Sequence, residues 1–352
     1  MKMFRNDYSE GAAPEILDAL VRTNAEQVPG YTEGDAHCDR ARELIREACG
    51  RDDVAVEFCI GGTSANVLGV TGLLEEWQGA ICTPDAHINV HETGAVGACG
   101  RTVLTTSDTD GFLTPEGAEH VYQFQTSCGR HMTQPGLIYI SNTTELAGVW
   151  DLERFDAICD WADEHGLKIF MDGARLGSAL TSPLAGGLTL EHIASRCDAF
   201  YIGGTKNGML FGEAMVIADP KLKSSFPYLV KERGGLLAKG RLLGVQFETA
   251  FEQPAGGDEA LYWHLARNAN ERAERLRAGM LALGYEPYGQ AGSNQQFFIV
   301  EPNEAEAFVQ AVDCEVFFTL DDGRKVIRLV CSWATTDADV DELLTWAGKL
   351  RA

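Results

Sequence analysis

Seven short apolar runs, rich in β-branched and aromatic residues, recur between residues 53 and 219, and stretches with helical spacing of apolar positions separate them. The runs are mostly apolar on both faces, as are strands of a parallel sheet that helices cover on each side. The stretch "LERFDAICDWADEHG" at residues 152–166 predicts one intervening helix, because it is amphipathic and ends at a glycine suited to a helix C-cap. The pattern predicts an α/β fold with a mainly parallel, seven-stranded sheet. The expected strands are residues 54–60, 79–84, 101–106, 136–141, 167–172, 198–203 and 213–218.

A second, smaller unit is expected at the C-terminal end. The segment "FEQPAGGD" at residues 251–258 is the clearest break in composition. We therefore expect residues 1–252 to form an N-terminal segment with a large domain, and residues 253–352 to form a small α+β domain. Its expected elements are a long helix at 259–284, strands at 295–300, 314–320 and 325–333, a short helix at 304–312, a turn at 321–324 and a final helix capped by Thr335 or Thr336.

Composition limits the partners and the compartment. The formal net charge is −23, from 52 acidic and 29 basic side chains in 352 residues. Such a charge repels phosphate backbones and anionic membrane surfaces, so neither nucleic acid nor a membrane is an expected partner. The N-terminal residues lack the apolar core of a signal peptide, and a cytoplasmic protein is expected. The ten cysteines form no C-x-x-C pair, which argues against a zinc site and favours buried, reduced thiols.

Candidate ligand-binding residues follow the first and the second expected strand. Ligands of open α/β sheets bind at this position, beyond the carboxyl ends of the strands. "GGTSAN" begins at Gly61, and Gly62 and Thr63 would present free N–H groups to a phosphate at a helix N-terminus, although an ordinary turn has the same composition. "HINVHETGA" places His87 and His91 four residues apart. On a helix they would share a face and suit a metal, but a ring stacked on a planar ligand and a core histidine are alternatives.

Two later strands end in residues of opposite charge. Asp172 ends the strand at 167–172, and a buried carboxylate there needs a cationic partner. Arg175 is one candidate partner, and a protonated heterocyclic nitrogen is the other. Lys206 follows the strand at 198–203, where desolvation would make its amine a nucleophile for carbonyl carbons, unless "TKNG" is an exposed turn.

The order of these residues along the chain predicts a seat for pyridoxal 5′-phosphate. Lys206 offers an amine to the cofactor aldehyde, and Asp172 offers an anion to the pyridine nitrogen. His87 offers a flat neighbour for the ring. Gly62 and Thr63 offer donors to the phosphate, for which Lys239 in "GGLLAKGR" is the candidate cation.

The chain resembles the low-specificity L-threonine aldolases, within the β-eliminating lyase group of fold type I pyridoxal-phosphate enzymes. The likeness runs nearly end to end, through "FRNDYSEGAAPEIL", "GYTEGD", "GGTSAN", "HINVHETGA", "MDGARLG", "GGTKNGMLFGEA", "GGLLAKGRLLG" and "IRLVCSWATT". The resemblance implies a pyridoxal-phosphate cofactor and an amino-acid substrate. It also implies a homotetramer built from dimers, with each active site at a dimer interface.

Matching positions imply roles for individual residues. Lys206 matches the family's Schiff-base lysine, Asp172 the residue facing the pyridine nitrogen, and His87 the ring-stacking histidine. Gly62 and Thr63 match the phosphate loop. Arg175 and Arg328 match the two arginines that hold the substrate carboxylate. Asn6 stands where many relatives have a serine that also contacts this carboxylate, and Lys239 stands where many have an arginine. Tyr31 matches a segment that reaches a neighbouring subunit's site.

The resemblance implies retro-aldol cleavage of β-hydroxy-α-amino acids such as L-threonine or L-allo-threonine into glycine and an aldehyde. The base for the β-hydroxyl proton is His87 or His91, since histidine titrates near neutrality. The alternatives with the same cofactor are β-elimination, transamination and decarboxylation. A pyridoxal-phosphate-binding regulator is an alternative of another class, which the absence of a basic patch and of spare length disfavours.

Overall fold

The larger part of the chain is built on one seven-stranded sheet. The computed structural model describes residues 1–254, 259–290 and 292–351. Strand order is β1-β7-β6-β5-β4-β2-β3, and β7 runs antiparallel to both of its neighbours while the remaining pairs are parallel. All seven strands lie within the runs expected from the sequence or overlap them, so the predicted sheet is confirmed. The strands are β1 (Ala55–Cys59), β2 (Gln78–Cys82), β3 (Thr102–Thr105), β4 (Gln134–Ser141), β5 (Lys168–Asp172), β6 (Ala199–Gly203) and β7 (Glu213–Ile217).

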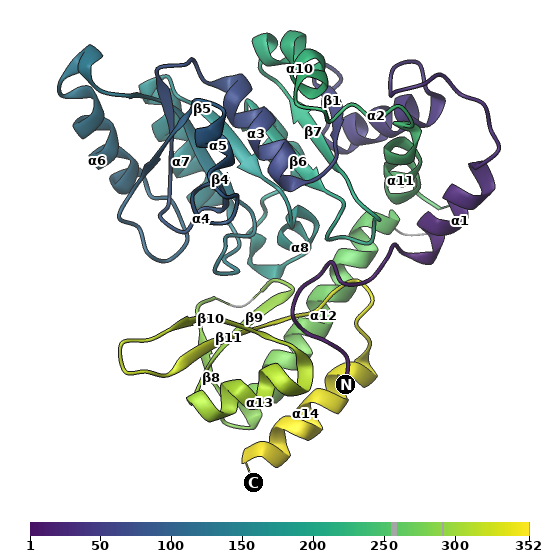
Figure 1. Cartoon of the computed structure of the whole chain (residues 1–352), viewed down its shortest axis with the longest axis vertical. Helices are drawn as coiled ribbons and strands as arrows, with labels where there is room; N and C mark the ends of the chain where they lie inside the picture. The colour runs from purple at the N-terminus through teal and green to yellow at the C-terminus, as the bar shows by residue number, and fades with distance from the viewer. Residues whose placement is uncertain (255–258, 291, 352) are drawn as a thin grey trace.

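Helices cover both faces of this sheet (Figure 1). Successive residues of a strand point to opposite faces. Phe170 therefore packs in the core beneath α3 and α10, whereas Ile169 and Met171 pack in the core on the other face, with α7 and α9. The helices are α1 (Pro14–Thr23), α2 (Ala36–Ala48), α3 (Gly62–Leu73), α4 (His87–Val90), α5 (Ala95–Ala98), α6 (Pro115–Thr126), α7 (Leu152–His165), α8 (Leu176–Leu180), α9 (Leu190–Arg196), α10 (Pro220–Glu232) and α11 (Arg241–Phe251), with 3-10 turns at Gly129–His131 and Pro183–Ala185.

Two local features fix these helices on the sheet. Helix α7 has the predicted ends, because the Asp151 side chain accepts a hydrogen bond from the N–H of Arg154 and Gly166 takes the left-handed conformation with φ 66°. On the other face, Gly69 lets α3 approach β5 closely. A Cβ atom at Gly69 would lie 2.1 Å from the ring of Phe170. Close packing of α3 on the sheet brings its N-terminus to the edge where the strands end.

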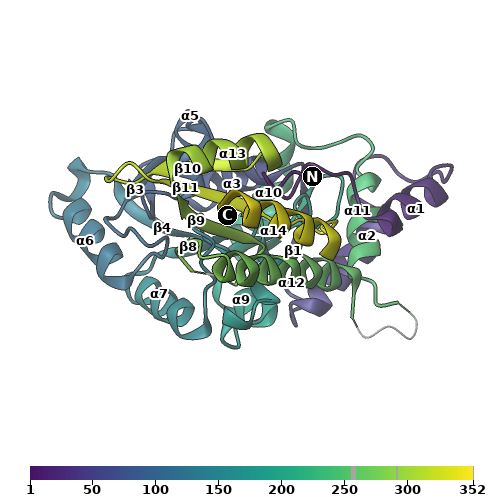
Figure 2. The same cartoon turned by 90° about the horizontal axis from the view of Figure 1, so that it is seen from below.

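The C-terminal part carries a separate four-stranded antiparallel sheet, in the order β10-β11-β9-β8. Helix α12 links it to the large sheet, and Figure 2 shows α12, α13 and α14 around the small sheet. The predicted strands and helices are present, and β8 is an additional strand that the sequence pattern did not indicate. The elements are α12 (Leu261–Ala282), β8 (Glu286–Tyr288), β9 (Gln295–Val300), α13 (Pro302–Val312), β10 (Glu315–Thr319), β11 (Lys325–Val330) and α14 (Asp337–Arg351).

The ends of the small unit clarify two expectations. Thr336 caps α14, because its hydroxyl accepts a hydrogen bond from the N–H of Asp339 at 3.2 Å. Part of the expected boundary, residues 255–258, lies outside the described residues, and the division at 252 stays a prediction.

Phe4 is buried in the core of the small unit, and its backbone bonds to Val312 and Val330. The N-terminal segment therefore packs on the C-terminal unit (Figure 1).

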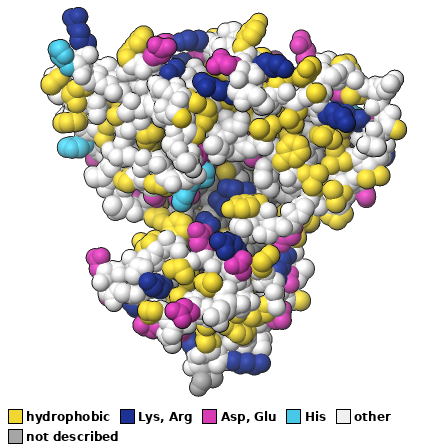
Figure 3. Space-filling view, viewed as in Figure 1, with side chains coloured by type: hydrophobic (Ala, Val, Ile, Leu, Met, Phe, Trp, Pro, Cys, Tyr) yellow, Lys and Arg dark blue, Asp and Glu magenta, His cyan; other side chains and the backbone are white. Residues whose placement is uncertain are grey.

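The space between the two units is hollowed in the space-filling view, with Lys, Arg and His side chains in it (Figure 3). No helix in the described part of the chain combines the length and the apolar character needed to cross a bilayer.

Candidate active site

A cavity of about 330 Å³ opens at the carboxyl ends of β1, β5 and β6. The chain reaches this edge repeatedly because parallel strands end on the same side of a sheet. Six of the candidate residues line the cavity, although they come from segments up to 144 positions apart along the chain. They are Gly62, Thr63, His87, Asp172, Arg175 and Lys206.

Asp172 is held at the end of β5 as a buried anion. It is 4% exposed, and four donors point at its carboxylate: the hydroxyl of Tyr201 at 2.5 Å, the hydroxyl of Tyr139 at 2.7 Å, Nδ2 of Asn66 at 2.8 Å and the N–H of Ala174 at 3.0 Å. Burial by itself raises the pKa of Asp172, but His87 and these hydrogen bonds outweigh it, and the pKa lies below its usual value. The carboxylate is therefore ionised at neutral pH.

Arg175 does not pair with Asp172, so that alternative is wrong. Its Nε and Nη2 atoms donate instead to the two carboxylate oxygens of Asp7, at 2.7 and 3.1 Å. Nδ2 of Asn294 donates to the same carboxylate at 2.8 Å. Asp7 is a site residue that the sequence analysis missed, since only its neighbour Asn6 was singled out. The fully buried Asp7 carboxylate therefore fixes the orientation of the guanidinium group of Arg175, a residue that lines the cavity.

Lys206 lies in the turn that follows β6, and its side chain is half-buried. Its Nζ atom is 5.9 Å from the ring centroid of Tyr8, which also lines the cavity. Burial, with the nearby charge of Arg175, lowers the pKa of Lys206 below its usual value. Lys206 therefore lines the cavity and loses its proton more readily than an ordinary lysine. An amine must be in this neutral form to act as a nucleophile.

His87 begins the short helix α4 and is oriented by a carboxylate. Its Nδ1 atom lies 2.9 Å from Oε1 of Glu92, a buried residue that the sequence analysis did not single out. Burial lowers the pKa of His87, but Glu92 and Asp172 raise it more, and the net shift is upward. The His91 ring is 5.4 Å from the His87 ring and lies outside the cavity lining. Within the described ranges, no set of three His, Cys, Asp or Glu side chains is grouped to hold a metal.

The turn "GGT" leads into α3 as expected. Helix α3 begins at Gly62, and the preceding residue makes no side-chain cap hydrogen bond to it. The first N–H groups of a helix have no partner within it, and the positive end of the helix dipole lies there. Gly62 and Thr63 therefore present to the cavity an arrangement that suits an anion.

Arg328 lies on β11 of the small unit and is not among the residues that line this cavity. Its Nη1 donates to Oε1 of Gln295 at 3.2 Å, and its Nη2 pairs with Glu315. Burial and the like charge of Arg175 lower the pKa of Arg328, which indicates that the two guanidinium groups are near each other. Nε of Arg328 and Nε2 of Gln295 are buried donors without a hydrogen-bond partner in the described part of the chain. Unsatisfied buried donors beside two arginines suit a carboxylate ligand.

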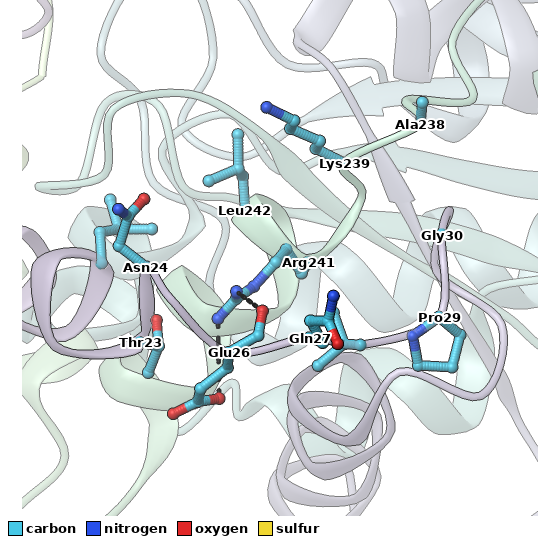
Figure 4. Close-up of a pocket in the computed structure, with 12 residues that line it drawn as sticks. Thr23, Asn24, Glu26, Gln27, Pro29, Gly30, Ala238, Lys239, Arg241 and Leu242 are labelled. Atoms are coloured by element: carbon cyan, nitrogen blue, oxygen red, sulfur yellow. Dashed lines mark hydrogen bonds and ion pairs between the residues drawn. The ribbon is translucent and has the colours of Figure 1, made fainter.

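The remaining candidates lie elsewhere in this chain. Lys239 lines a different cavity of about 640 Å³, between the segment at residues 20–30 and the start of α11 (Figure 4). On its wall, Arg241 donates to the backbone oxygen of Glu26 at 3.1 Å. Tyr31 lies beside it, with its N–H bonded to Ala238 at 2.9 Å. Asn6 uses its side-chain oxygen for the turn that follows it, accepting from the N–H of Tyr8 and the hydroxyl of Ser9.

An α/β fold with an aspartate ending one strand, a lysine following the next, and a glycine turn entering a helix at the same edge is that of the fold type I pyridoxal-phosphate enzymes. Residues 4–302 match the family model described as "Beta-eliminating lyase", and the chain belongs to this family.

Known relatives cover the whole chain. The low-specificity L-threonine aldolase of Pseudomonas sp. (strain NCIMB 10558) is 30% identical over 356 residues, which cover 100% of this chain and 97% of the relative. The solved structure of Leishmania major threonine aldolase is 39% identical, covers 100% of both chains and superposes with a TM-score of 0.95. Cystalysin from Treponema denticola, a structure that contains pyridoxal 5′-phosphate, is 13% identical, with a TM-score of 0.73 over 99% of this chain and 90% of that one; it shares the fold. The predicted family resemblance and fold class are confirmed.

Proposed function

We propose that this protein cleaves β-hydroxy-α-amino acids, such as L-threonine and L-allo-threonine, into glycine and an aldehyde with the help of pyridoxal 5′-phosphate. The observation that carries the proposal is that Asp172 and Lys206 line the same cavity. The aspartate is an anion with no arginine partner among the described residues, and the lysine is an amine of lowered pKa. The names of the relatives give the reaction class.

The cavity's donors and acceptors fit the cofactor. Lys206 would bind its aldehyde carbon, Asp172 would face its ring nitrogen, and His87 would lie against its ring. Gly62 and Thr63 would bind its phosphate. When bound, pyridoxal phosphate supplies an electron sink for the pair of electrons released from the substrate's Cα–Cβ bond.

The protein's own residues would orient the substrate. Arg175 and Arg328 would hold the substrate carboxylate from the large and the small unit, respectively. Asp7 fixes the guanidinium plane of Arg175, so the carboxylate would meet a donor set that is already in place. Asn6 is proposed to add a further donor to the substrate carboxylate. Two-point binding by planar groups would fix which substrate bond faces the reacting side of the site.

His87 is proposed as the base that takes the β-hydroxyl proton. Its Nδ1 is engaged by Glu92, which leaves Nε2 as the atom available to the substrate. His91 is the second candidate, but it does not line the cavity. Glu92 would stabilise the imidazolium that forms when the proton is taken.

Lys239 and Tyr31 are proposed to act at the site of a neighbouring subunit. In one chain Lys239 lines the second cavity (Figure 4), and the backbone of Tyr31 bonds to Ala238 on its wall. A homotetramer built from dimers, with each active site at a dimer interface, would bring the ammonium of Lys239 to a neighbour's phosphate. A cytoplasmic location is also proposed, because a reducing compartment suits the free cysteines, most of which are buried.

The test is an assay of the purified protein with L-threonine, without a keto acid. We expect acetaldehyde and glycine in equal amounts, and neither from Lys206→Ala. Ammonia with an α-keto acid in place of these products would put β-elimination ahead. Dependence on an added keto acid would put transamination ahead, carbon dioxide would indicate decarboxylation, and cofactor binding without turnover of any amino acid would indicate a regulator.

A further inference from the structure

A second buried carboxyl lies at the base of the turn that carries Lys206. Glu213, the first residue of β7, is 3% exposed and lines the same cavity. Its Oε2 accepts a hydrogen bond from the N–H of Gly204 at 2.8 Å, and its Oε1 accepts from the hydroxyl of Thr205 at 2.7 Å. Glu213 therefore binds the two residues that directly precede the lysine.

The turn between β6 and β7 is closed on itself around this carboxyl. The N–H groups of Gly204 and Thr205 both donate to the backbone oxygen of Gly212, at 3.0 and 3.2 Å. The N–H of Gly212 donates in turn to the Thr205 hydroxyl at 3.0 Å. A Cβ atom at Gly204 would lie 2.4 Å from Sδ of Met209. This network fixes the backbone that leads into Lys206 relative to the Glu213 carboxyl.

Glu213 lies in the same charged region as the lysine, whose own pKa responds mainly to burial and to Arg175, Asp7, Glu145 and Asp172. The ionisable groups that face it are Lys206 in the turn, Asp172 from β5, Cys59 from β1 and Tyr262 from α12, with Tyr201 of β6 beside them. Among these, Lys206 is the cation. Burial raises the pKa of Glu213 to about 7, against the effect of its two hydrogen bonds and of Lys206. The carboxyl therefore changes its charge near neutral pH.

We propose that Glu213 is a positioning residue for Lys206, one that holds the lysine's turn through its hydrogen bonds to Gly204 and Thr205 and whose charge contributes to the pH range in which the lysine amine is neutral. The ionised carboxylate stabilises the ammonium form, and the protonated carboxyl favours the free amine. As the pH falls through neutrality, Glu213 takes up a proton and its support for the ammonium form is lost. The neutral, nucleophilic amine then persists to lower pH than it would beside a permanent anion.

The role proposed for Glu213 rests on the proposed function of Lys206. The experiment that tests it does not require aldolase activity. The cofactor-free protein is labelled with trace acetic anhydride across a pH series, and the acetylation of Lys206 is followed by peptide mass mapping. Glu213→Gln removes the charge and keeps an oxygen acceptor for Gly204. We expect its Lys206 labelling curve to move to lower pH, with labelling at pH 8 roughly three- to tenfold faster than in the wild type.

Matched variants separate charge from structure. Glu57→Gln removes a carboxyl from the neighbouring strand β1, where Glu57 pairs with Arg42 outside the cavity lining, and it should leave the Lys206 curve unmoved. Thr205→Val keeps the carboxyl but removes one of its donors. Glu213 should then stay protonated to higher pH, and the curve should move in the same direction by a smaller amount. This variant tests the proposal if Glu213→Gln does not fold.

Two outcomes would overturn the inference. One is an unchanged labelling curve in Glu213→Gln together with an unchanged curve in Thr205→Val. The other is a shift of equal size in Glu57→Gln. A shift confined to the Glu213 and Thr205 variants, in a protein that does not cleave threonine, would reject the proposed function and leave the coupling of the two side chains intact. In the cofactor-loaded protein, the pH titration of the visible absorbance should shift in the same direction.

Discussion

Nδ1 of His87 and Oε1 of Glu92 lie 2.9 Å apart, at the start of a chain of hydrogen bonds that ends at Asp172. Nδ2 of Asn66 connects the two carboxylates, at 2.7 Å from Glu92 and 2.8 Å from Asp172. The Glu92 side chain is fully buried, so its charge acts on His87 with little screening by solvent. This contact orients His87, and together with the charge of Asp172 it raises the pKa of His87.

Glu92→Gln should shift the pH dependence of turnover. Glu92 raises the pKa of His87, so its loss lowers that pKa, and His87 stays neutral to lower pH. The acidic limb of kcat should therefore move to lower pH, and kcat should fall by less than the ~10²–10⁴-fold expected on removing a general base. The measurement is a kcat–pH profile beside Glu164→Gln, an exposed carboxylate of α7. If the acidic limb of kcat does not move, Glu92 does not control the protonation of the base in turnover.

Asp7→Asn should destabilise the protein at neutral pH by about 3–5 kcal/mol, because it leaves the buried Arg175 guanidinium without its counter-charge. Burial raises the pKa of Asp7, but Arg175 and Lys206 lower it to below its usual value. The ion pair therefore stabilises the fold fully above the unfolded carboxyl pKa, and this stabilisation is lost as the pH falls through the folded value.

The stability of Asp7→Asn is measured by urea unfolding at pH 7 and again near pH 3.5. The difference from the wild type should shrink at the lower pH. Asp313→Asn, which breaks the exposed pair with Arg5, is the control and should change little. A gap between Asp7→Asn and the wild type that stays constant with pH would contradict the assignment of the effect to the Asp7 charge.

Arg328→Lys should impair substrate use while the charge is kept. Hydrogen bonds to a charged group contribute about 1.5–3 kcal/mol, which corresponds to a loss of ~10–150-fold in kcat/KM for L-threonine. A lysine cannot make the two parallel bonds of a guanidinium. Arg324→Lys, on the exposed turn between β10 and β11, serves as the matched control. Equal kcat/KM values for the two variants would exclude Arg328 from carboxylate binding.

Gly69→Ala should destabilise the large unit by about 1–3 kcal/mol, because the new methyl group would overlap the Phe170 ring. Gly97→Ala in α5 has nothing within 4 Å of its new methyl group, and its unfolding midpoint should stay the same or rise. Thermal unfolding of both variants tests this. Equal midpoints would mean that α3 shifts away from β5 at no cost.

The sequence by itself determined the strands, the main helices and the residues at the strand ends. The reason is local: apolar runs with both faces buried, a glycine after α7, and polar residues placed directly after strands are visible within a few positions. The same locality places Asp172, Lys206, His87 and the glycine turn at one edge of the predicted sheet. It missed β8, a three-residue strand too short to show a period.

Only the tertiary structure decided which charges pair. Asp172 and Arg175 are only three positions apart, which predicts a pair, but the backbone turns after β5 and Arg175 bonds to Asp7, 168 positions away. The buried carboxyls of Glu92 and Glu213 gave no local signal, since a glutamate in a polar stretch and one at a strand start are both commonplace. Their roles depend on burial and on partners from other segments, because the cost of a buried charge is set by what surrounds it in space, and the order of residues along the chain does not reveal those surroundings.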